Sequence, residues 1–318
     1  MNGNDGTRVQ VTLRVHRFTP RPERDRPRSG SPFAKQGSPF GSGTARRRPR
    51  GKQWTQDYLL SVLPDTTILD CLLDIKRTQD PSLTFRYSCG HGMCGSDAVA
   101  INGTPTLLCT AKVKDWAVAQ TARNTTDAEG FRKTTGTDDD PADNAADVSG
   151  TSGVSGAHDG SPLVIELSAL PGFPVQRDLI ADIDPMLEQI KRLKPYLQAD
   201  GKLATTKDGK IDVFEYLQRP EQLAAYETLS NCIACGVCEG SCPVFAGGEA
   251  FIGPAALITA SRFINDSRDT AADARMDAID TADGIAACQS VRACSRHCPR
   301  GIDVGEEIWQ LIAKVKEH

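Results

Sequence analysis

Two runs of closely spaced cysteines in the second half of the chain have the spacing that binds inorganic clusters. They read Cys232-Ile-Ala-Cys235-Gly-Val-Cys238-Glu-Gly-Ser-Cys242-Pro243 and Cys288-Gln-Ser-Val291-Arg-Ala-Cys294-Ser-Arg-His-Cys298-Pro299. Runs of the pattern C-x2-C-x2-C-x3-C-P bind cubane iron–sulfur clusters through their thiolates. The second run departs from that pattern at one position, because Val291 stands where its second cysteine belongs.

Ligand counting assigns cysteines to two clusters. In chains with two such clusters, the fourth cysteine of each run ligates the cluster of the other run. One cluster therefore receives the complete set Cys232, Cys235, Cys238 and Cys298. The other receives only Cys242, Cys288 and Cys294, since Val291 cannot bind iron. A cubane with three thiolates can lose one iron, so the sequence predicts one [4Fe–4S] cluster, one [3Fe–4S] cluster and the transfer of single electrons.

A third group of candidate ligands lies nearer the N-terminus. It reads Cys89-Gly-His-Gly-Met-Cys94-Gly-Ser-Asp97 and is followed by Cys109. Plant-type [2Fe–2S] clusters use C-x4-C-x2-C with a distant fourth cysteine, and Asp97 occupies the third position of that register. A carboxylate is an anionic oxygen ligand for iron, although harder than thiolate. We predict a [2Fe–2S] site from these four residues; the alternative is that Asp97 only begins the next strand.

Zinc is the alternative metal, because paired C-x2-C motifs also build four-thiolate zinc sites. Zinc ribbons use two separated pairs, whereas each run here crowds its ligand positions into one short stretch. Pro243 and Pro299 at matching positions also favour iron–sulfur clusters. Two further residues are predicted not to be ligands: Cys71 as a small buried core residue, and His91 as an exposed loop residue.

The length of 318 residues predicts two domains. No run of 18 or more uncharged apolar residues is present, so no transmembrane helix is predicted, and the N-terminus lacks the apolar region of a secretory signal. Eleven cysteines in clustered spacing indicate metal binding in a reducing cytosol rather than disulfides.

Charge is distributed unevenly along the chain. Residues 1–52 hold 13 Lys/Arg against 3 Asp/Glu, and the remainder holds 24 against 38. Such a basic segment could contact nucleic acid or anionic lipid. No aromatic ladder accompanies it, so we interpret it as a solvated insert and expect no nucleic-acid partner.

The predicted elements of the first half follow the order strand, strand, helix, cysteine loop, strands. Strands are predicted at residues 9–15, 54–63, 97–101, 106–109 and 163–167. A helix is predicted between the capping residues Asp65-Thr66-Thr67 and the breaker Asp80-Pro81, and Asn102-Gly103 is a hairpin-turn signal. This is the order of the β-grasp fold of plant-type ferredoxins.

Two low-complexity stretches interrupt this domain, and a helical region follows it. Residues 20–51 and 121–161 are predicted to be disordered inserts because they cannot bury enough apolar surface. Helices are predicted at residues 182–193, 220–229, 253–266, 271–286 and 304–316. We therefore predict an α+β protein: a β-grasp domain of residues 1–120 and 162–178, then an all-helical, bacterial-ferredoxin-like domain of residues 179–318.

Three clusters in the order [2Fe–2S], [4Fe–4S], [3Fe–4S], on a ferredoxin domain followed by a helical domain, resemble a known family. It comprises the iron–sulfur subunits of succinate dehydrogenase and quinol:fumarate reductase (complex II). The supporting stretches are Asp80 to Asp97, Leu170 to Asp178, Cys232 to Pro243, and Phe251 to Thr270. The resemblance covers the chain apart from the two inserts. Some members carry an aspartate at the position of Asp97 as the fourth [2Fe–2S] ligand.

The resemblance implies a function within a larger complex. A flavoprotein subunit with covalent FAD oxidises succinate to fumarate, and electrons pass through the three clusters to a quinone at membrane anchor subunits. This chain would be the electron-transfer subunit of succinate dehydrogenase (quinone), serving the tricarboxylic acid cycle and aerobic respiration. We expect a peripheral membrane protein on the cytoplasmic face of the cell membrane that performs no chemistry on succinate itself.

The expected quinone site departs from the family pattern. Many members carry a tryptophan shortly after the crossing cysteine, but Cys242 is followed by Pro-Val-Phe-Ala-Gly. A histidine is common after the first three-iron ligand, where this chain has Gln289. By position, Pro243, Gln289 and Val291 are expected near the quinone. A menaquinone partner and a different anchor arrangement are two explanations of the departure.

Three alternatives to this function stay open from the sequence. Fumarate reductase runs the same architecture in the opposite direction. A subunit that feeds electrons to a thiol- or heterodisulfide-linked reductase shares the architecture as well. A zinc-stabilised module whose residues 1–52 contact nucleic acid belongs to another class.

Overall fold

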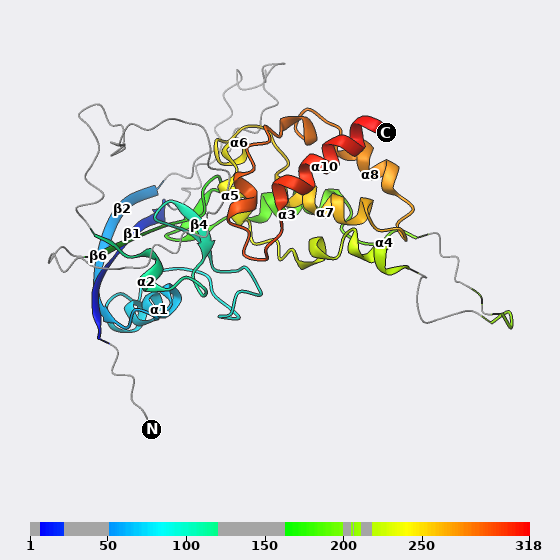
Figure 1. Ribbon diagram of the computed structural model, residues 1–318. Helices are drawn as coiled ribbons and strands as arrows, with labels where there is room; N and C mark the ends of the chain where they lie inside the picture. Colours follow the sequence, from blue (N-terminus) through cyan, green and yellow to red (C-terminus); the bar gives the residue numbers. More distant parts are fainter. Residues whose placement is uncertain (1–6, 22–50, 120–162, 200–204, 206, 211–217) are drawn as a thin grey trace, which may run out of the picture.

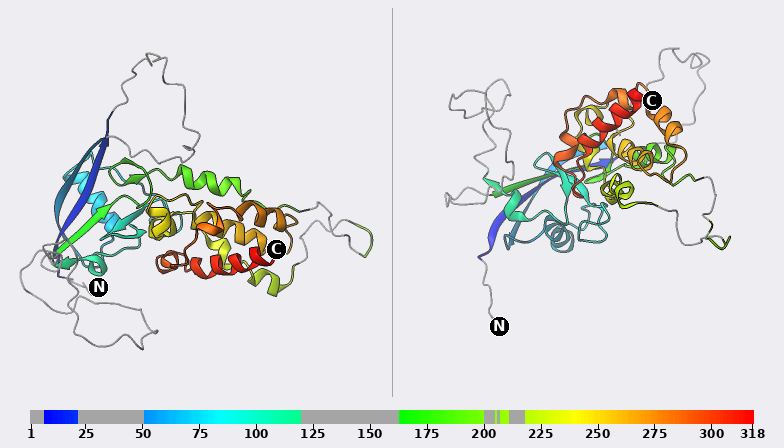
Figure 2. Two further views of the ribbon diagram at one scale, coloured as in Figure 1. Left: turned by 90° about the horizontal axis from the view of Figure 1, so that it is seen from above. Right: turned by 45° about the vertical axis from the view of Figure 1, so that its right-hand side comes forward.

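The computed structural model describes residues 7–21, 51–119, 163–199, 205, 207–210 and 218–318. These residues form a sheet region and a helical region that lie end to end (Figures 1 and 2). The predicted inserts lie almost wholly outside the described residues. The predicted bounds of the first insert, 20–51, were wrong at both ends, because Pro20 and Gly51 are paired strand residues.

A mixed sheet builds the first region. Its strands are β1 (Val9–Pro20), β2 (Gly51–Val62), β3 (Ala98–Ile101), β4 (Thr104–Leu107), β5 (Val118–Ala119) and β6 (Leu163–Ser168). Their order is β2-β1-β6-β3-β4, with β5 also paired to β6. Strand β1 is antiparallel to β2 and parallel to β6. The return of residues 163–167 to the first domain, predicted from the sequence, is thereby confirmed.

Strands β3 and β4 are joined by a tight turn at the end of the hairpin opposite the cysteine loop. Asn102 and Gly103 have φ of 51° and 83° between β3 and β4, which is the left-handed pair that a two-residue hairpin requires. The hairpin is confirmed, but the predicted strand 106–109 begins earlier and ends at Leu107. Cys109 consequently lies in the turn after the strand.

Helix α1 (Ile68–Thr78) covers the sheet (Figure 1). The Thr67 side chain accepts a hydrogen bond from the Asp70 N–H, which caps the helix as its sequence predicts. Cys71 is 1% exposed on the inner side of α1, so its prediction as a core residue is confirmed. Burial raises the pKa of its thiol to about 12. The short helix α2 (Val113–Trp116) follows the turn at Cys109.

The helical region is built around α7 (Pro254–Ile264), most of whose residues are buried. The other helices are α3 (Asp184–Arg192), α4 (Pro220–Ala224), α5 (Val237–Ser241), α6 (Pro243–Ala246), α8 (Ala272–Ile279), α9 (Ala293–Arg296) and α10 (Val304–Glu317), with single 3₁₀ turns η2 (Thr228–Asn231) and η3 (Ile285–Ala287). Two predictions were too long. The helix predicted at 220–229 ends at Ala224, and the one predicted at 271–286 ends at Ile279.

A buried ion network joins the sheet to the segment that leads out of it. The hairpin β7 (Val175–Arg177) and β8 (Ile180–Ala181) turns at Asp178, which is 1% exposed with φ of 45°. Asp178 Oδ1 lies 2.9 Å from Arg17 Nε, and its other oxygen accepts hydrogen bonds from Thr84. Arg17 also pairs with Asp80 at 2.6 Å. The network therefore joins β1, the segment 80–84 that precedes the cysteine loop, and the turn between β7 and β8.

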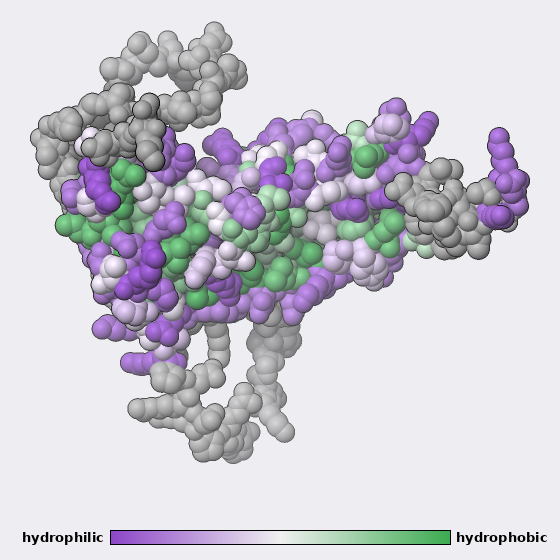
Figure 3. All heavy atoms as spheres, turned by 90° about the horizontal axis from the view of Figure 1, so that it is seen from below, coloured by the Kyte–Doolittle hydropathy of each residue, from purple (hydrophilic) through white to green (hydrophobic). Residues whose placement is uncertain are grey.

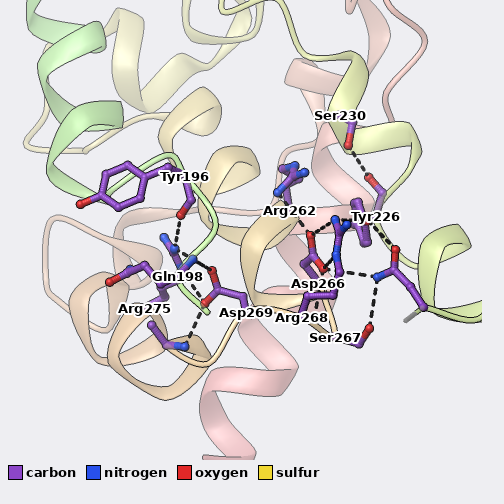
Figure 4. Close-up of polar contacts among 12 residues, drawn as sticks. Tyr196, Gln198, Tyr226, Ser230, Arg262, Asp266, Ser267, Arg268, Asp269 and Arg275 are labelled. Carbon is purple, nitrogen blue, oxygen red and sulfur yellow. Dashed lines mark hydrogen bonds and ion pairs between the residues drawn. The ribbon is translucent and has the colours of Figure 1, made fainter. Parts of the chain in front are cut away.

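A second polar network stabilises the end of α7 (Figure 4). Asp266 pairs with Arg268 at 2.8 Å, and Asp269 pairs with Arg275 at 2.9 Å. Arg275 also donates hydrogen bonds to the carbonyls of Leu193, Lys194 and Tyr196. These contacts tie the chain after α3 to the turn between α7 and α8. Among the described residues, no helix is long and apolar enough to cross a membrane.

Candidate iron–sulfur sites

The N-terminal site is formed by the glycine-rich loop from Cys89 to Asp97 together with Cys109. Gly90, Gly92 and Gly95 all have φ between 66° and 79°, a backbone conformation that suits glycine. Backbone N–H groups of His91 and Met93 face the Cys89 sulfur, and they lower the pKa of this thiol to about 7. The Cys94 thiol lies beside the Cys89 thiol, and the Cys109 thiol lies beside the Asp97 carboxylate.

Asp97 is positioned as an inward-facing acid rather than as a solvated strand residue. It is 3% exposed, and its Oδ2 accepts a hydrogen bond of 2.7 Å from the Cys109 N–H. Its Oδ1 is buried without a hydrogen-bond partner in the described residues. Burial, followed by the contact with Asp97, raises the pKa of Cys109 to about 12. A buried carboxylate oxygen with no hydrogen bond fits a metal-ligand role.

The structure brings the four predicted [4Fe–4S] ligands together. Cys232, Cys235, Cys238 and Cys298 line one apolar hollow with Ile258 and Ile302, which we name the four-cysteine hollow. The Cys298 side chain thus lies with the cysteines of the first run rather than with those of its own, as the crossing rule predicts. Burial raises the pKa of the Cys235 thiol to about 12 and that of Cys238 well above its usual range.

The three remaining cysteines line a separate cavity. Cys242, Cys288 and Cys294 surround what we name the three-cysteine hollow. Its other walls come from the residues predicted near a quinone and from α7 and α10: Pro243, Val244, Phe251, Pro254, Gln289, Ser290, Val291, Arg292, Ala293 and Ile308. Pro243, Gln289 and Val291 are exposed, with Val291 at 54%. These three residues lie at the surface end of the hollow, and Val291 stands at the position that Cys235 holds in the first run.

The two runs repeat one backbone conformation. In the first run Ala234 and Gly236 have φ of 48° and 79°, and in the second run Ser290 and Arg292 have φ of 55° and 58°. These are the residues before and after the second ligand position, held by Cys235 and Val291. The second run therefore keeps the loop of a four-ligand run although it lacks the thiol.

The N-terminal site and the four-cysteine hollow are in direct contact. A Cβ on Gly95 would lie 2.5 Å from the Cβ of Cys235, so only glycine fits there. A second contact joins Met93 to Arg300, whose Nη1 lies 3.1 Å from the Met93 sulfur. Arg300 also lines the four-cysteine hollow, and its Nε is buried without a protein partner in the described chain. A donor left free beside four thiols fits a sulfur-rich anionic group.

Sequence reasoning missed several polar residues at these sites. Ser96 Oγ lies 3.1 Å from the Cys94 sulfur, Arg300 lines the four-cysteine hollow, and Glu239 contacts Cys238. Their position next to ligands was the available signal. His91 is exposed, as predicted, and its ring contacts the Cys89 carbonyl at 2.7 Å. No group of three His, Cys, Asp or Glu side chains among the described residues could hold a single metal ion.

Comparison with known proteins identifies the family. Residues 12–188 match the model of a 2Fe-2S iron-sulfur cluster binding domain, and residues 228–302 match that of a 4Fe-4S dicluster domain. The chain is 32% identical to the fumarate reductase iron-sulfur subunit of Mycobacterium tuberculosis, over 83% of this chain and 86% of that protein. The chain belongs to the succinate dehydrogenase and fumarate reductase iron–sulfur subunits.

Members with both names are similar to this chain. The succinate dehydrogenase iron-sulfur subunit of Coxiella burnetii is 30% identical over 82% of this chain and 89% of its own length. The fold resembles that of a chain in the structure of the Mycobacterium smegmatis Sdh1 complex in the apo form, with a TM-score of 0.62 and 20% identity. That match covers 98% of this chain and 97% of the other. The matches thus place a 2Fe-2S binding domain mainly in the sheet region and a 4Fe-4S dicluster domain in the helical region.

Proposed function

We propose that this chain is the electron-transfer subunit of a succinate:quinone oxidoreductase. The observation that carries the proposal is the series of three ligand groups: the N-terminal loop touches the four-cysteine hollow, and α5 joins that hollow to the three-cysteine hollow. When bound, the clusters would act as one-electron carriers along this series. The protein would hold them at fixed spacing.

The ligand assignment is part of the proposal. Cys89, Cys94, Asp97 and Cys109 would hold [2Fe–2S]; Cys232, Cys235, Cys238 and Cys298 would hold [4Fe–4S]; and Cys242, Cys288 and Cys294 would hold [3Fe–4S]. The partner-free Oδ1 of Asp97 and the separation of the seven C-terminal cysteines into two hollows support it. We also propose that the first domain has the β-grasp fold and that the second domain begins after residue 178.

The terminal site supports a quinone as the electron acceptor. The three-cysteine hollow opens at Pro243, Gln289 and Val291, so an apolar acceptor could approach the last cluster closely. No tryptophan lines that hollow among the described residues, and Gln289 supplies the polar group at its mouth. We propose that a quinone held by membrane anchor subunits binds here, and that the complex lies on the cytoplasmic face of the cell membrane.

A flavoprotein subunit would contact the opposite end of the series. Tyr87 and Met93, which flank ligands of the N-terminal site, are 53% and 49% exposed. Large exposed apolar side chains around a redox site are typical of a protein interface. Figure 3 shows apolar residues gathered on the lower face, where the sheet and helical regions meet. We propose that the FAD-containing subunit covers this part of the chain.

Fumarate reduction is the second candidate function. It is favoured by the relatives named fumarate reductase iron-sulfur subunit, including one from Haemophilus influenzae that is 30% identical over 77% of this chain. The two directions use the same ligands. The potentials of the clusters and of the quinone decide which direction predominates.

The experiment is redox-titrated electron paramagnetic resonance of the complex purified with its partners. We expect three signals, and Asp97→Ala should alter only the [2Fe–2S] signal. Asp115→Ala, at an exposed residue of α2, is the matched control. An unchanged [2Fe–2S] spectrum in Asp97→Ala would remove this residue from the ligand set. Stoichiometric zinc without brown absorption in the wild-type protein would refute the iron–sulfur function altogether.

A further inference from the structure

The N-terminal loop meets the four-cysteine hollow at a glycine. Gly95 lies between Cys94 and Asp97, two proposed ligands of the first cluster. It faces Cys235, a proposed ligand of the second cluster, and a Cβ on Gly95 would lie 2.5 Å from the Cβ and 3.0 Å from the Cα of that residue. Carbon atoms in favourable contact are about 3.5–4.0 Å apart. Any side chain at this position would therefore force the loop and Cys235 apart.

Both sides of this contact are held in place. Asp97, at the end of the loop, is 3% exposed and accepts a hydrogen bond of 2.7 Å from the Cys109 N–H. Gly236, next to Cys235, is packed so closely that a Cβ on it would lie 3.1 Å from Leu170. A cavity beside the contact has a volume of about 20 Å³, which is room for about one water molecule. The two sites are therefore separated by packed protein atoms rather than by a layer of solvent.

A second contact holds the other side of Cys94. Arg300 follows Cys298 by two residues and lines the four-cysteine hollow. Its Nη1 lies 3.1 Å from the sulfur of Met93. Because Met93 and Gly95 flank Cys94, the part of the loop that carries this ligand is held against the helical region at two points.

We propose that Gly95 is a positioning residue that sets the distance for electron transfer between the first two clusters. Because it carries no side chain, the N-terminal site lies directly against Cys235, and the contact of Arg300 with Met93 keeps it there. One electron passes from the first site to the second with no change in bonds or protons, and its donor is succinate, oxidised by the proposed flavoprotein partner. The rate of such a transfer falls exponentially with the distance between the carriers. The inference rests on the cluster assignment of the proposed function.

Gly95→Ala in the whole complex tests this inference. The added methyl group should move the loop away from Cys235, so two measurements should change. The magnetic coupling between the two reduced clusters, observed by paramagnetic resonance, should weaken. The transfer of an electron from the first site to the second, started by flash photoreduction and followed by absorption, should slow several-fold.

Two other glycines separate the contact from backbone strain. Gly103→Ala, in the turn between β3 and β4, has φ of 83° and nothing within 4 Å of the added Cβ, so it should leave both measurements unchanged. Gly90→Ala adds the same kind of strain inside the ligand loop, where φ is 74° and the added Cβ again meets nothing within 4 Å. It should weaken the coupling less than Gly95→Ala does.

An unchanged coupling and an unchanged rate in Gly95→Ala would overturn the inference, and so would an equal loss of coupling in Gly90→Ala. If Gly95→Ala does not bind the first cluster, Arg300→Ala keeps the loop sequence intact and removes the second contact. The coupling should weaken in that variant too, and an unchanged value there would overturn the inference. Missing [2Fe–2S] or [4Fe–4S] signals in the wild-type protein would instead refute the proposed function.

Discussion

The two cysteine runs have the same backbone and different surroundings. Both place left-handed residues before and after the second ligand position. In the first run Gly236 packs under Leu170 and Phe173 from the sheet side, and Cys238 is buried against Glu239. In the second run Arg292 occupies the position of Gly236 and forms exposed ion pairs with Asp303 and Glu306.

The comparison separates what the backbone of a run determines from what its side chains determine. The loop conformation is kept whether or not the second ligand is a cysteine, so the fold determines where a cluster can sit. On the proposed ligand assignment, the side chains then determine how many irons the site holds. The first run is covered by Leu170 and Phe173, whereas the second presents Val291 at the surface.

The largest effect should follow from exchanging the crossing ligand. Cys298→Ser alters the second run in sequence, but its side chain lies in the four-cysteine hollow. We expect loss of the [4Fe–4S] signal with the three-iron signal retained. Electron transfer to quinone should fall by at least the ~10–100-fold that changes around ligands cost. Cys294→Ser should give the opposite spectrum. Loss of the three-iron signal in Cys298→Ser would show that the runs do not cross.

Val291→Cys should convert one kind of site into the other. The loop already has the backbone of a complete run, so the new thiol completes a set of four. We expect the oxidised [3Fe–4S] signal to disappear and a second [4Fe–4S] signal to replace it. Val291→Ser is the control of similar exposure. An undiminished three-iron signal in Val291→Cys would mean that the missing ligand does not set the iron count.

Asp178→Asn should destabilise the segment 170–178, in which Leu170 and Phe173 pack against Gly236 of the first run. The side chains of Arg17 and Asp178 are 3% and 0% exposed, and removing one partner leaves a buried charge incompletely paired. We expect a loss of about 3–5 kcal/mol in the free energy of unfolding, measured by urea denaturation. Asp57→Asn breaks the exposed pair with Arg14 and should cost less than about 1 kcal/mol.

The same pair gives the protein a defined pH dependence. Desolvation opposes ionisation of Asp178, but hydrogen bonds from Arg17, Thr84 and Phe18 leave its pKa below the ordinary value. The pKa of Asp80 is lowered as well, against desolvation, by Ser82, Tyr58 and Arg17. Their stabilisation is present above the unfolded pKa of about 3.9 and is lost as the pH falls through the folded values. The stability difference between wild type and Asp178→Asn should therefore shrink below about pH 4.

The smallest effects should come from exchanging the left-handed residues. Gly236→Ala adds a Cβ 3.1 Å from Leu170 in a conformation that costs about 1–2 kcal/mol for a side chain. Arg292→Gly relieves that strain but loses two exposed ion pairs, so its net effect should be within about 0.5 kcal/mol. Thermal unfolding of the two variants measures the contrast. Equal destabilisation by both would show that the runs are supported in the same way.

The sequence was sufficient to predict which C-terminal cysteines lie together and to predict much of the sheet. Cysteine spacing predicted the two hollows, and alternation predicted the strand pairs, because these signals are local. The helix predicted at 271–286 was too long because its second half turns at Gly284, where a Cβ would lie 2.1 Å from the Ile279 carbonyl. Helices of four or five residues, such as α5 and α9, carry no period to detect.

Long-range burial could not be predicted. Glu239 is an ordinary polar residue in its run, and only the approach of α7 makes it a buried acid. Arg17 likewise became central through Asp178, which is far away in sequence. Both cases depend on which segments meet in space. The stretch from Leu170 to Asp178 resembles the family in sequence, and the structure gives its physical role as a link between the sheet region and the helical region.

The contact between Gly95 and Cys235 also constrains assembly. With the two regions docked, the N-terminal loop lies directly against Cys235 and leaves no room for a side chain at Gly95. A donor protein that delivers a preformed cluster to the four-cysteine hollow from this side must act before docking. Loading from this side would therefore require the helical region to receive its cluster before the N-terminal loop closes over Cys235.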